Sequence, residues 1–235
     1  MDWEVIINAY PEDAAGIEKA RQIYSAVVEA VQKLEVPGID CTLPVENIAT
    51  LIPSAELADI CKGVWKEVLG KDPDVDIEQA LGAFVSGGSI PEPEQGAEDL
   101  LPMFLRPVVS SYLRRVREKN KELVSSPQGQ GKCPFCGMYP RLCFDSESSR
   151  DLHCLMCGQE WRFQRVKCPF CGNSDHTTLG YFEVESVEGI RVYFCSECKH
   201  YIKIIDTKTR LAHDAETEDI LSLALDVAAQ EEGYL

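Results

Sequence analysis

Eight of the 11 cysteines in this 235-residue chain fall in four Cys-x-x-Cys pairs, a spacing typical of metal ligands. Four thiolates placed about 2.3 Å from one ion form a closed tetrahedral site that suits zinc or iron. Between the first two pairs lie 17 residues, between the last two 23, and between the two sets 10. We therefore predict two metal ions, each bound by four cysteines: Cys133, Cys136, Cys154 and Cys157 in site 1, and Cys168, Cys171, Cys195 and Cys198 in site 2.

The two sets repeat one another. The run Cys-Pro-Phe-Cys-Gly begins at Cys133 and again at Cys168, and β-type residues flank a turn between the two pairs of each set. Each insert can therefore form a hairpin that brings its two pairs together. A glycine, which tolerates positive φ, follows three of the pairs, whereas Lys199 follows the fourth, and we expect that turn to be distorted.

Redox-active dithiols are the competing interpretation of the pairs. A thioredoxin-like dithiol is usually a single pair beside a βαβ unit, and no such unit is visible in the sequence. Closed four-thiolate sites leave no open coordination position for hydrolysis, so we expect no metallohydrolase. Iron would make each four-cysteine module rubredoxin-like and able to carry one electron. Zinc would make each module purely structural. The remaining thiols, Cys41, Cys61 and Cys143, are expected to pack in the protein interior.

Helical periodicity fills the N-terminal half. Apolar residues recur at helix spacing in four segments: 13–34, 54–68, 73–86 and 97–124. A polar linker follows at 125–132, short β-type runs then alternate with the cysteine pairs, and a final amphipathic helix spans 214–230. We predict an α+β fold with two tandem rubredoxin-like or zinc-ribbon β modules. Its parts are an all-helical domain over 1–126, the first metal ribbon over 127–167, the second over 168–213, and a C-terminal helix over 214–235 that docks on the body.

The chain is acidic, with a formal net charge of -16 that is unevenly spread. Residues 1–126 carry -10, residues 127–213 carry +1, and residues 214–235 carry -7. An acidic chain repels phosphate backbones, which disfavours nucleic-acid binding apart from a basic cluster at 114–121. We interpret that cluster as the solvated C-terminal end of a helix.

The sequence also predicts where the protein works. The first thirty residues lack the pattern of a secretory signal, and the longest apolar stretch is far below the roughly 20 residues of a membrane span. Paired cysteines in a reducing compartment are more often metal ligands than disulfides. We therefore predict a cytoplasmic protein with no membrane partner.

Several runs in the C-terminal half resemble those of the formate dehydrogenase accessory proteins, the FdhE family. They are LHCLMCGQEWRFQRVKCPFCGN, CSECKHYIKI and the ending EDILSLALDVAAQEEGYL. The upstream run AEDLLPMFLRPVVSSYLRR is similar to the helical region of that family. The resemblance covers the cysteine-rich part well and the rest of the helical part loosely.

The resemblance implies a cytoplasmic maturation factor that binds the catalytic subunit of a molybdenum or tungsten formate dehydrogenase. It implies no conventional enzyme activity, and hence no catalytic residue, and it implies that the eight paired cysteines bind iron of the rubredoxin type. Two other functions remain open on the residues alone. One is a rubredoxin-like electron carrier, which requires iron, and the other is a nucleic-acid-binding zinc ribbon.

Overall fold

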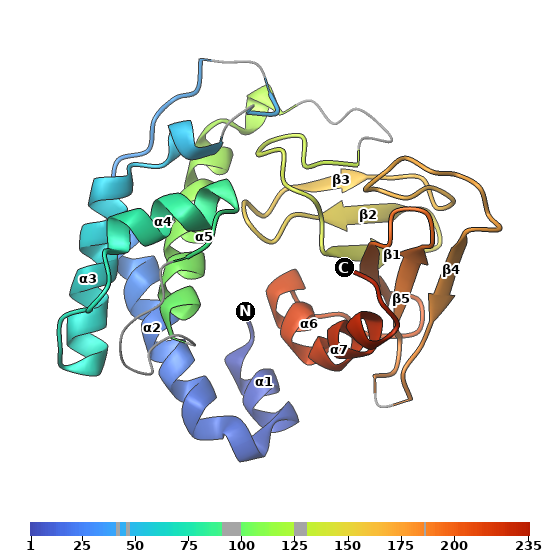
Figure 1. The fold of residues 1–235 in the computed structure, drawn as a ribbon, viewed down its shortest axis with the longest axis horizontal. Helices are drawn as coiled ribbons and strands as arrows, with labels where there is room; N and C mark the ends of the chain where they lie inside the picture. Colours follow the sequence, from blue (N-terminus) through green and yellow to red (C-terminus); the bar gives the residue numbers. More distant parts are fainter. Residues whose placement is uncertain (41–42, 46–47, 91–99, 125–130, 186) are drawn as a thin grey trace. The chain divides into compact units, whose positions relative to one another are not determined.

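The computed structural model describes residues 1–40, 43–45, 48–90, 100–124, 131–185 and 187–235. They form two compact units (Figure 1). The helical unit is Pro11–Leu123, and the sheet unit combines Met1–Tyr10 with Val124–Leu235. The sheet unit contains both groups of paired cysteines.

The described part of the helical unit is built from α-helices and short 3-10 turns. They are η1 (Pro11–Asp13), α2 (Ala14–Gln32), η2 (Ile48–Leu51), α3 (Ser54–Leu69), α4 (Ile77–Ser86), α5 (Leu101–Lys119) and η3 (Lys121–Leu123). Their apolar faces meet in a core where the Trp65 ring of α3 packs 4.8 Å from the Phe104 ring of α5. Helix α4 begins later than the pattern predicts because the Asp76 side chain caps its first N–H groups.

A single six-stranded sheet lies at the centre of the sheet unit, with strand order β3-β2-β1-β6-β5-β4. The strands are β1 (Leu142–Asp145), β2 (Arg150–His153), β3 (Glu160–Arg162), β4 (Leu179–Phe182), β5 (Ile190–Cys195) and β6 (Tyr201–Asp206). The three strands of each ribbon pair antiparallel, which confirms the predicted hairpins between the cysteine pairs.

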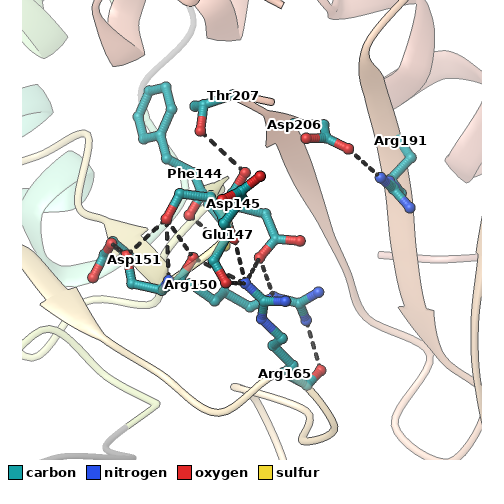
Figure 2. Close-up of polar contacts among 12 residues, drawn as sticks. Phe144, Asp145, Glu147, Arg150, Asp151, Arg165, Arg191, Asp206 and Thr207 are labelled. Carbon is teal, nitrogen blue, oxygen red and sulfur yellow. Dashed lines mark hydrogen bonds and ion pairs between the residues drawn. The ribbon is translucent and has the colours of Figure 1, made fainter. Parts of the chain in front are cut away.

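A parallel pairing joins the two ribbons. Strand β1 lies beside β6, with Leu142 opposite Lys203 and Asp145 opposite Asp206. The Thr207 N–H and hydroxyl extend the pairing, since both donate to the Asp145 carbonyl, at 3.0 and 3.1 Å (Figure 2). The sequence predicts separate tandem modules, whereas the structure makes them one sheet. Strand periodicity identifies which face is buried but not which strand is the neighbour, so the sequence pattern could not reveal this pairing.

Arginines neutralise the two aspartates at the ends of the joined strands (Figure 2). The Asp145 carboxylate, 9% exposed, lies 3.2 Å from the Arg165 guanidinium and 3.7 Å from that of Arg150. The Asp206 carboxylate, 10% exposed, lies 2.9 Å from the Arg191 guanidinium. A buried carboxylate without a cation is costly, so these pairs allow two acidic residues to end adjacent strands.

The C-terminal segment forms two helices where the sequence predicts one over 214–230. They are α6 (Ala215–Leu221) and α7 (Leu223–Glu231). Ser222 separates them, because its hydroxyl donates to the Glu218 carbonyl at 2.6 Å and competes with the helical backbone bond. Leu225 of α7 is buried in the same apolar cluster as Val192 of β5, so this segment packs against the sheet.

The first ten residues belong to the sheet unit, whereas the sequence predicts a helical domain over 1–126. Helix α1 (Trp3–Ala9) lies beside α6 (Figure 1). The Asp2 N–H donates to the Thr217 hydroxyl at 2.7 Å. A seven-residue helix is shorter than the window over which periodicity can be recognised, and its partner is distant in sequence, so only the fold shows where it belongs.

A fully buried lysine ties the C-terminal helices to the sheet. The Lys203 ammonium on β6 lies 2.8 Å from the Asp219 carboxylate of α6 and 2.7 Å from the Asp226 carboxylate of α7. The Tyr201 hydroxyl donates to the other Asp226 oxygen at 2.6 Å. Burial and the Asp226 charge raise the pKa of Tyr201, so its phenol keeps the proton that it donates.

The substitution Lys203→Met removes the fully buried cation that faces the Asp219 and Asp226 carboxylates. We expect it to lower the free energy of unfolding by about 3–5 kcal/mol, the usual cost of breaking a buried ion pair. Urea denaturation followed by circular dichroism measures the loss. Lys208→Met is the matched control, because the Lys208 ammonium is 4.0 Å from Asp206 and its side chain is 37% exposed, and a change below about 1 kcal/mol is expected. Equal losses in the two variants would contradict the role given to Lys203.

Candidate metal centres

The structure brings the eight predicted cysteines together in the two groups that the spacing indicates: Cys133, Cys136, Cys154 and Cys157 in site 1, and Cys168, Cys171, Cys195 and Cys198 in site 2. Within each group the four sulfur atoms all lie within 4.8 Å of one another. Each Sγ has a close neighbour from the opposite pair. These distances are 3.5 Å for Cys133–Cys157, 3.5 Å for Cys136–Cys154, 3.6 Å for Cys168–Cys198 and 3.8 Å for Cys171–Cys195.

The sulfur spacing fits one metal ion in each group. Sulfur atoms at the corners of a tetrahedron, each about 2.3 Å from a central ion, are about 3.8 Å apart. The neighbour distances of 3.5 to 3.8 Å agree with this value. Thiolates suit zinc and iron, whereas calcium and magnesium take oxygen ligands. Each group could therefore hold zinc or iron.

One backbone hydrogen-bond pattern builds all four Cys-x-x-Cys turns. The N–H of the first cysteine donates to the carbonyl five residues later, and the residue after the second cysteine donates back to the carbonyl of the first. In the turn that begins at Cys133 these bonds measure 2.8 and 3.0 Å. The same two bonds occur in the turns that begin at Cys154, Cys168 and Cys195. The four turns therefore present their sulfur atoms in the same way.

Lys199 adopts the conformation that glycine adopts in the other three turns. Its φ is 59°, compared with 73° at Gly137, 71° at Gly158 and 77° at Gly172. Its N–H donates to the Cys195 carbonyl at 2.9 Å, as in the other turns. The expected distortion is therefore absent, and the lysine occupies instead a left-handed conformation that its Cβ disfavours.

Two substitutions separate the effects of Lys199. Lys199→Gly and Lys199→Ala both remove the ammonium, which lies 5.7 Å from the centre of the Tyr234 ring, but only glycine removes the Cβ. We expect Lys199→Gly to be more stable than Lys199→Ala by about 1 kcal/mol. Guanidinium denaturation of the metal-loaded variants measures this difference. An alanine variant as stable as the glycine variant would show that the left-handed backbone carries no strain.

Hydrogen bonds reach two sulfur atoms of site 2. The Phe170 N–H donates to Cys168 Sγ at 3.4 Å, and the Asn173 amide donates to Cys195 Sγ at 3.6 Å. Burial raises the pKa of Cys195, but hydrogen bonds from the Cys198 N–H and the Asn173 amide contribute to lowering it to about 7. The thiolate form that metal binding requires is therefore favoured at this sulfur.

Asn173 is a site residue that the sequence interpretation missed. It directly follows the second Cys-Pro-Phe-Cys-Gly run, at the position where Met138 follows the first. This difference after two otherwise identical runs is the signal that could have identified it. The asparagine amide supplies a donor to sulfur that the methionine side chain lacks.

Two further thiols lie outside both groups. Cys61 of α3 and Cys143 of β1 are fully buried, and burial raises the pKa of each to about 12. A thiol that stays protonated packs as a small apolar group and is a poor nucleophile or ligand, in agreement with the packing role predicted for both. Cys41, given the same role, lies outside the described residues. His153 is not part of the site 1 group, and its Nδ1 lies 3.1 Å from a Glu160 carboxylate oxygen.

Residues 166–235 match the family model described as FdhE, C-terminal domain. A curated relative from Aquifex aeolicus, named Protein FdhE homolog, is 32% identical over 148 residues, which cover 59% of this chain and 50% of that protein. Over these residues the chain is similar to FdhE proteins. Protein FdhE of Escherichia coli O1:K1 / APEC is 33% identical over 107 residues, which cover 43% of this chain and 34% of that protein. The matches thus span half or less of these FdhE relatives.

The fold resembles that of a solved FdhE structure. The crystal structure of the FdhE protein from Pseudomonas aeruginosa aligns with 99% of this chain and with 91% of its own chain, at a TM-score of 0.72 and 18% identity. The predicted α+β class, with helices followed by β ribbons and C-terminal helices, is therefore confirmed. Among the described residues no helix combines the length and the apolar composition needed to cross a membrane.

Metal content tests the assignment of the eight cysteines. We expect the purified protein to carry two ions per chain and Cys133→Ser to carry about one, because loss of a thiolate ligand releases the ion and unfolds its ribbon. Elemental analysis and circular dichroism measure the two effects. Cys143→Ala is the matched control and should keep both ions, since Cys143 lies outside the groups. Loss of an ion from the control would contradict the assignment.

Proposed function

We propose that this protein is a formate dehydrogenase accessory protein that acts in the cytoplasm, binds the catalytic subunit of the enzyme and assists its maturation. The similarity of residues 166–235 to the FdhE C-terminal domain, and of the longer matched region to FdhE proteins, carries the proposal. The two four-cysteine groups support it, because all eight thiols that the family resemblance implies are present and lie at metal-binding distances.

A binding role agrees better with the sites than a catalytic role. An ion held by four thiolates has no free coordination position for a substrate. Metal binding and folding are coupled in small units of this kind, so each ion would stabilise the strands and turns around it. In this proposal the ions hold the surface of the sheet unit in the shape that the partner recognises, and no residue acts as a catalyst.

A rubredoxin-like electron carrier is the second candidate. Four thiolates suit iron as well as zinc, and Cys171 brings one ligand of site 2 to the protein surface, where an electron could enter. Anaerobic purification followed by visible spectroscopy separates the two candidates. Iron with a spectrum that dithionite reversibly bleaches would favour the carrier, whereas a colourless zinc protein would exclude it.

The basic cluster at the end of α5 does not favour a nucleic-acid-binding protein. The Arg115 and Lys119 side chains donate to backbone carbonyls within the helical unit, and the Lys121 ammonium pairs with Glu118 at 2.9 Å. These cations therefore stabilise the unit to which they belong. The structure supports the interpretation of the cluster as the end of a helix.

Direct binding to a purified formate dehydrogenase catalytic subunit tests the proposal. We expect the metal-loaded protein to form a complex detectable by titration calorimetry, and Cys136→Ser to weaken it, because site 1 would lose its ion and the surrounding fold. Cys143→Ala should bind as the unaltered protein does. Absence of binding by the folded, fully loaded protein would refute the proposed partner.

A further inference from the structure

Two copies of the same five residues have different surroundings. In the first Cys-Pro-Phe-Cys-Gly run, Phe135 is fully buried and Cys136 is 3% exposed. In the second, Phe170 is half-buried and Cys171 is exposed. Because the local sequence is identical, the difference arises from what the rest of the protein places over each run.

The second Cys-x-x-Cys turns of the two sites also differ in their exposure to solvent. Site 1 uses Cys-Leu-Met-Cys, in which Leu155 is buried and joins the apolar cluster between the sheet and α7. Site 2 uses Cys-Ser-Glu-Cys, in which Glu197 is exposed and the second cysteine, Cys198, is half-buried. All four ligands of site 1 are therefore shielded by protein, whereas site 2 is open to solvent along one side.

Contacts hold the last turn of site 2 and leave Cys171 as its accessible ligand. The Leu235 N–H donates to the Lys199 carbonyl at 2.7 Å, and the Tyr234 ring stacks on the Phe194 ring at 4.6 Å. These contacts fasten the turn that contains Cys195 to the C-terminal residues. The run that follows Cys171, residues 172–177, is exposed apart from half-buried Asn173.

We propose that site 2 is an exchangeable metal site and site 1 a permanent structural one. At site 2 the bond between the metal and Cys171 Sγ breaks, and a thiolate from another molecule takes the vacated coordination position. The ion keeps four sulfur ligands and its oxidation state throughout, and Cys171 is released as a thiolate. The inference concerns the metal sites alone and does not depend on the identity of the protein partner.

Metal release from the full-length, zinc-loaded protein tests this proposal. Dimercaptosuccinate, a small dithiol, is added in excess, and protein-bound zinc is followed by elemental analysis after rapid desalting. We expect two phases of one zinc ion each, the first faster by at least about tenfold, because an exposed ligand offers a lower barrier to displacement. A single phase that releases both ions would overturn the proposal.

Labelling identifies which sulfur leaves first. In separate samples a short pulse of N-ethylmaleimide is followed by peptide mass spectrometry. We expect Cys171 to be modified before any other ligand, and the ligands of site 1 to be modified last. Earlier labelling of a site 1 cysteine, or of Cys198 before Cys171, would overturn the assignment.

Two cysteine substitutions assign the phases of zinc release to the individual sites. Cys171→Ser should bind one zinc ion and lose the fast phase, with the slow phase unchanged. Cys136→Ser, in the matching position of the other run, should lose the slow phase. If Cys136→Ser does not fold, the labelling order of the unaltered protein still decides the proposal. A fast phase that persists in Cys171→Ser would contradict it.

Discussion

Four sulfur atoms must converge on one tetrahedron in each ribbon, and a Cys-x-x-Cys turn supplies only two of them. The hairpins bring the two Cys-x-x-Cys turns of each ribbon together. Strand β2 ends at His153, next to Cys154, and β5 ends at Cys195 itself, so pairing with β1 and β4 carries the second turn of each ribbon back toward the first. The register of these strand pairs and the position of the sulfur atoms therefore depend on each other, which is why metal binding and folding are expected to be coupled.

The two ribbons are also held in a fixed position relative to each other, because β1 and β6 pair in parallel and make a single sheet. The C-terminal helices attach to this sheet through charge as well as through apolar contacts. Lys203 faces Asp219 and Asp226, and Arg210 donates to the fully buried Glu218 at 2.9 Å. Part of the negative charge of residues 214–235 is therefore interior and paired, and is not a property of the surface. A separate backbone hydrogen bond, from the Leu235 N–H to the Lys199 carbonyl, places the last residues of the chain beside site 2.

The repeated Cys-Pro-Phe-Cys-Gly run does not determine how accessible each metal site is to solvent. Both begin with the same Cys-Pro-Phe-Cys-Gly run and use the same backbone hydrogen bonds, so their sulfur geometry is nearly the same. Their accessibility differs, because apolar side chains cover site 1 and polar, exposed residues surround much of site 2. Geometry fixes which metals suit a site, whereas accessibility controls how readily ligands can be displaced.

The sequence by itself determined the eight candidate ligands, their division into two groups, the helical and β segments and the resemblance to the FdhE family. Those features are local, since they depend on spacing, periodicity and short runs of residues. Tertiary structure alone decided that the ribbons form one sheet, that residues 1–10 join the sheet unit, that Lys203 is buried between two carboxylates and that Cys171 is exposed. Each of these depends on contacts between residues far apart in the chain, and neither periodicity nor the spacing of cysteines encodes which distant segment will cover a given side chain.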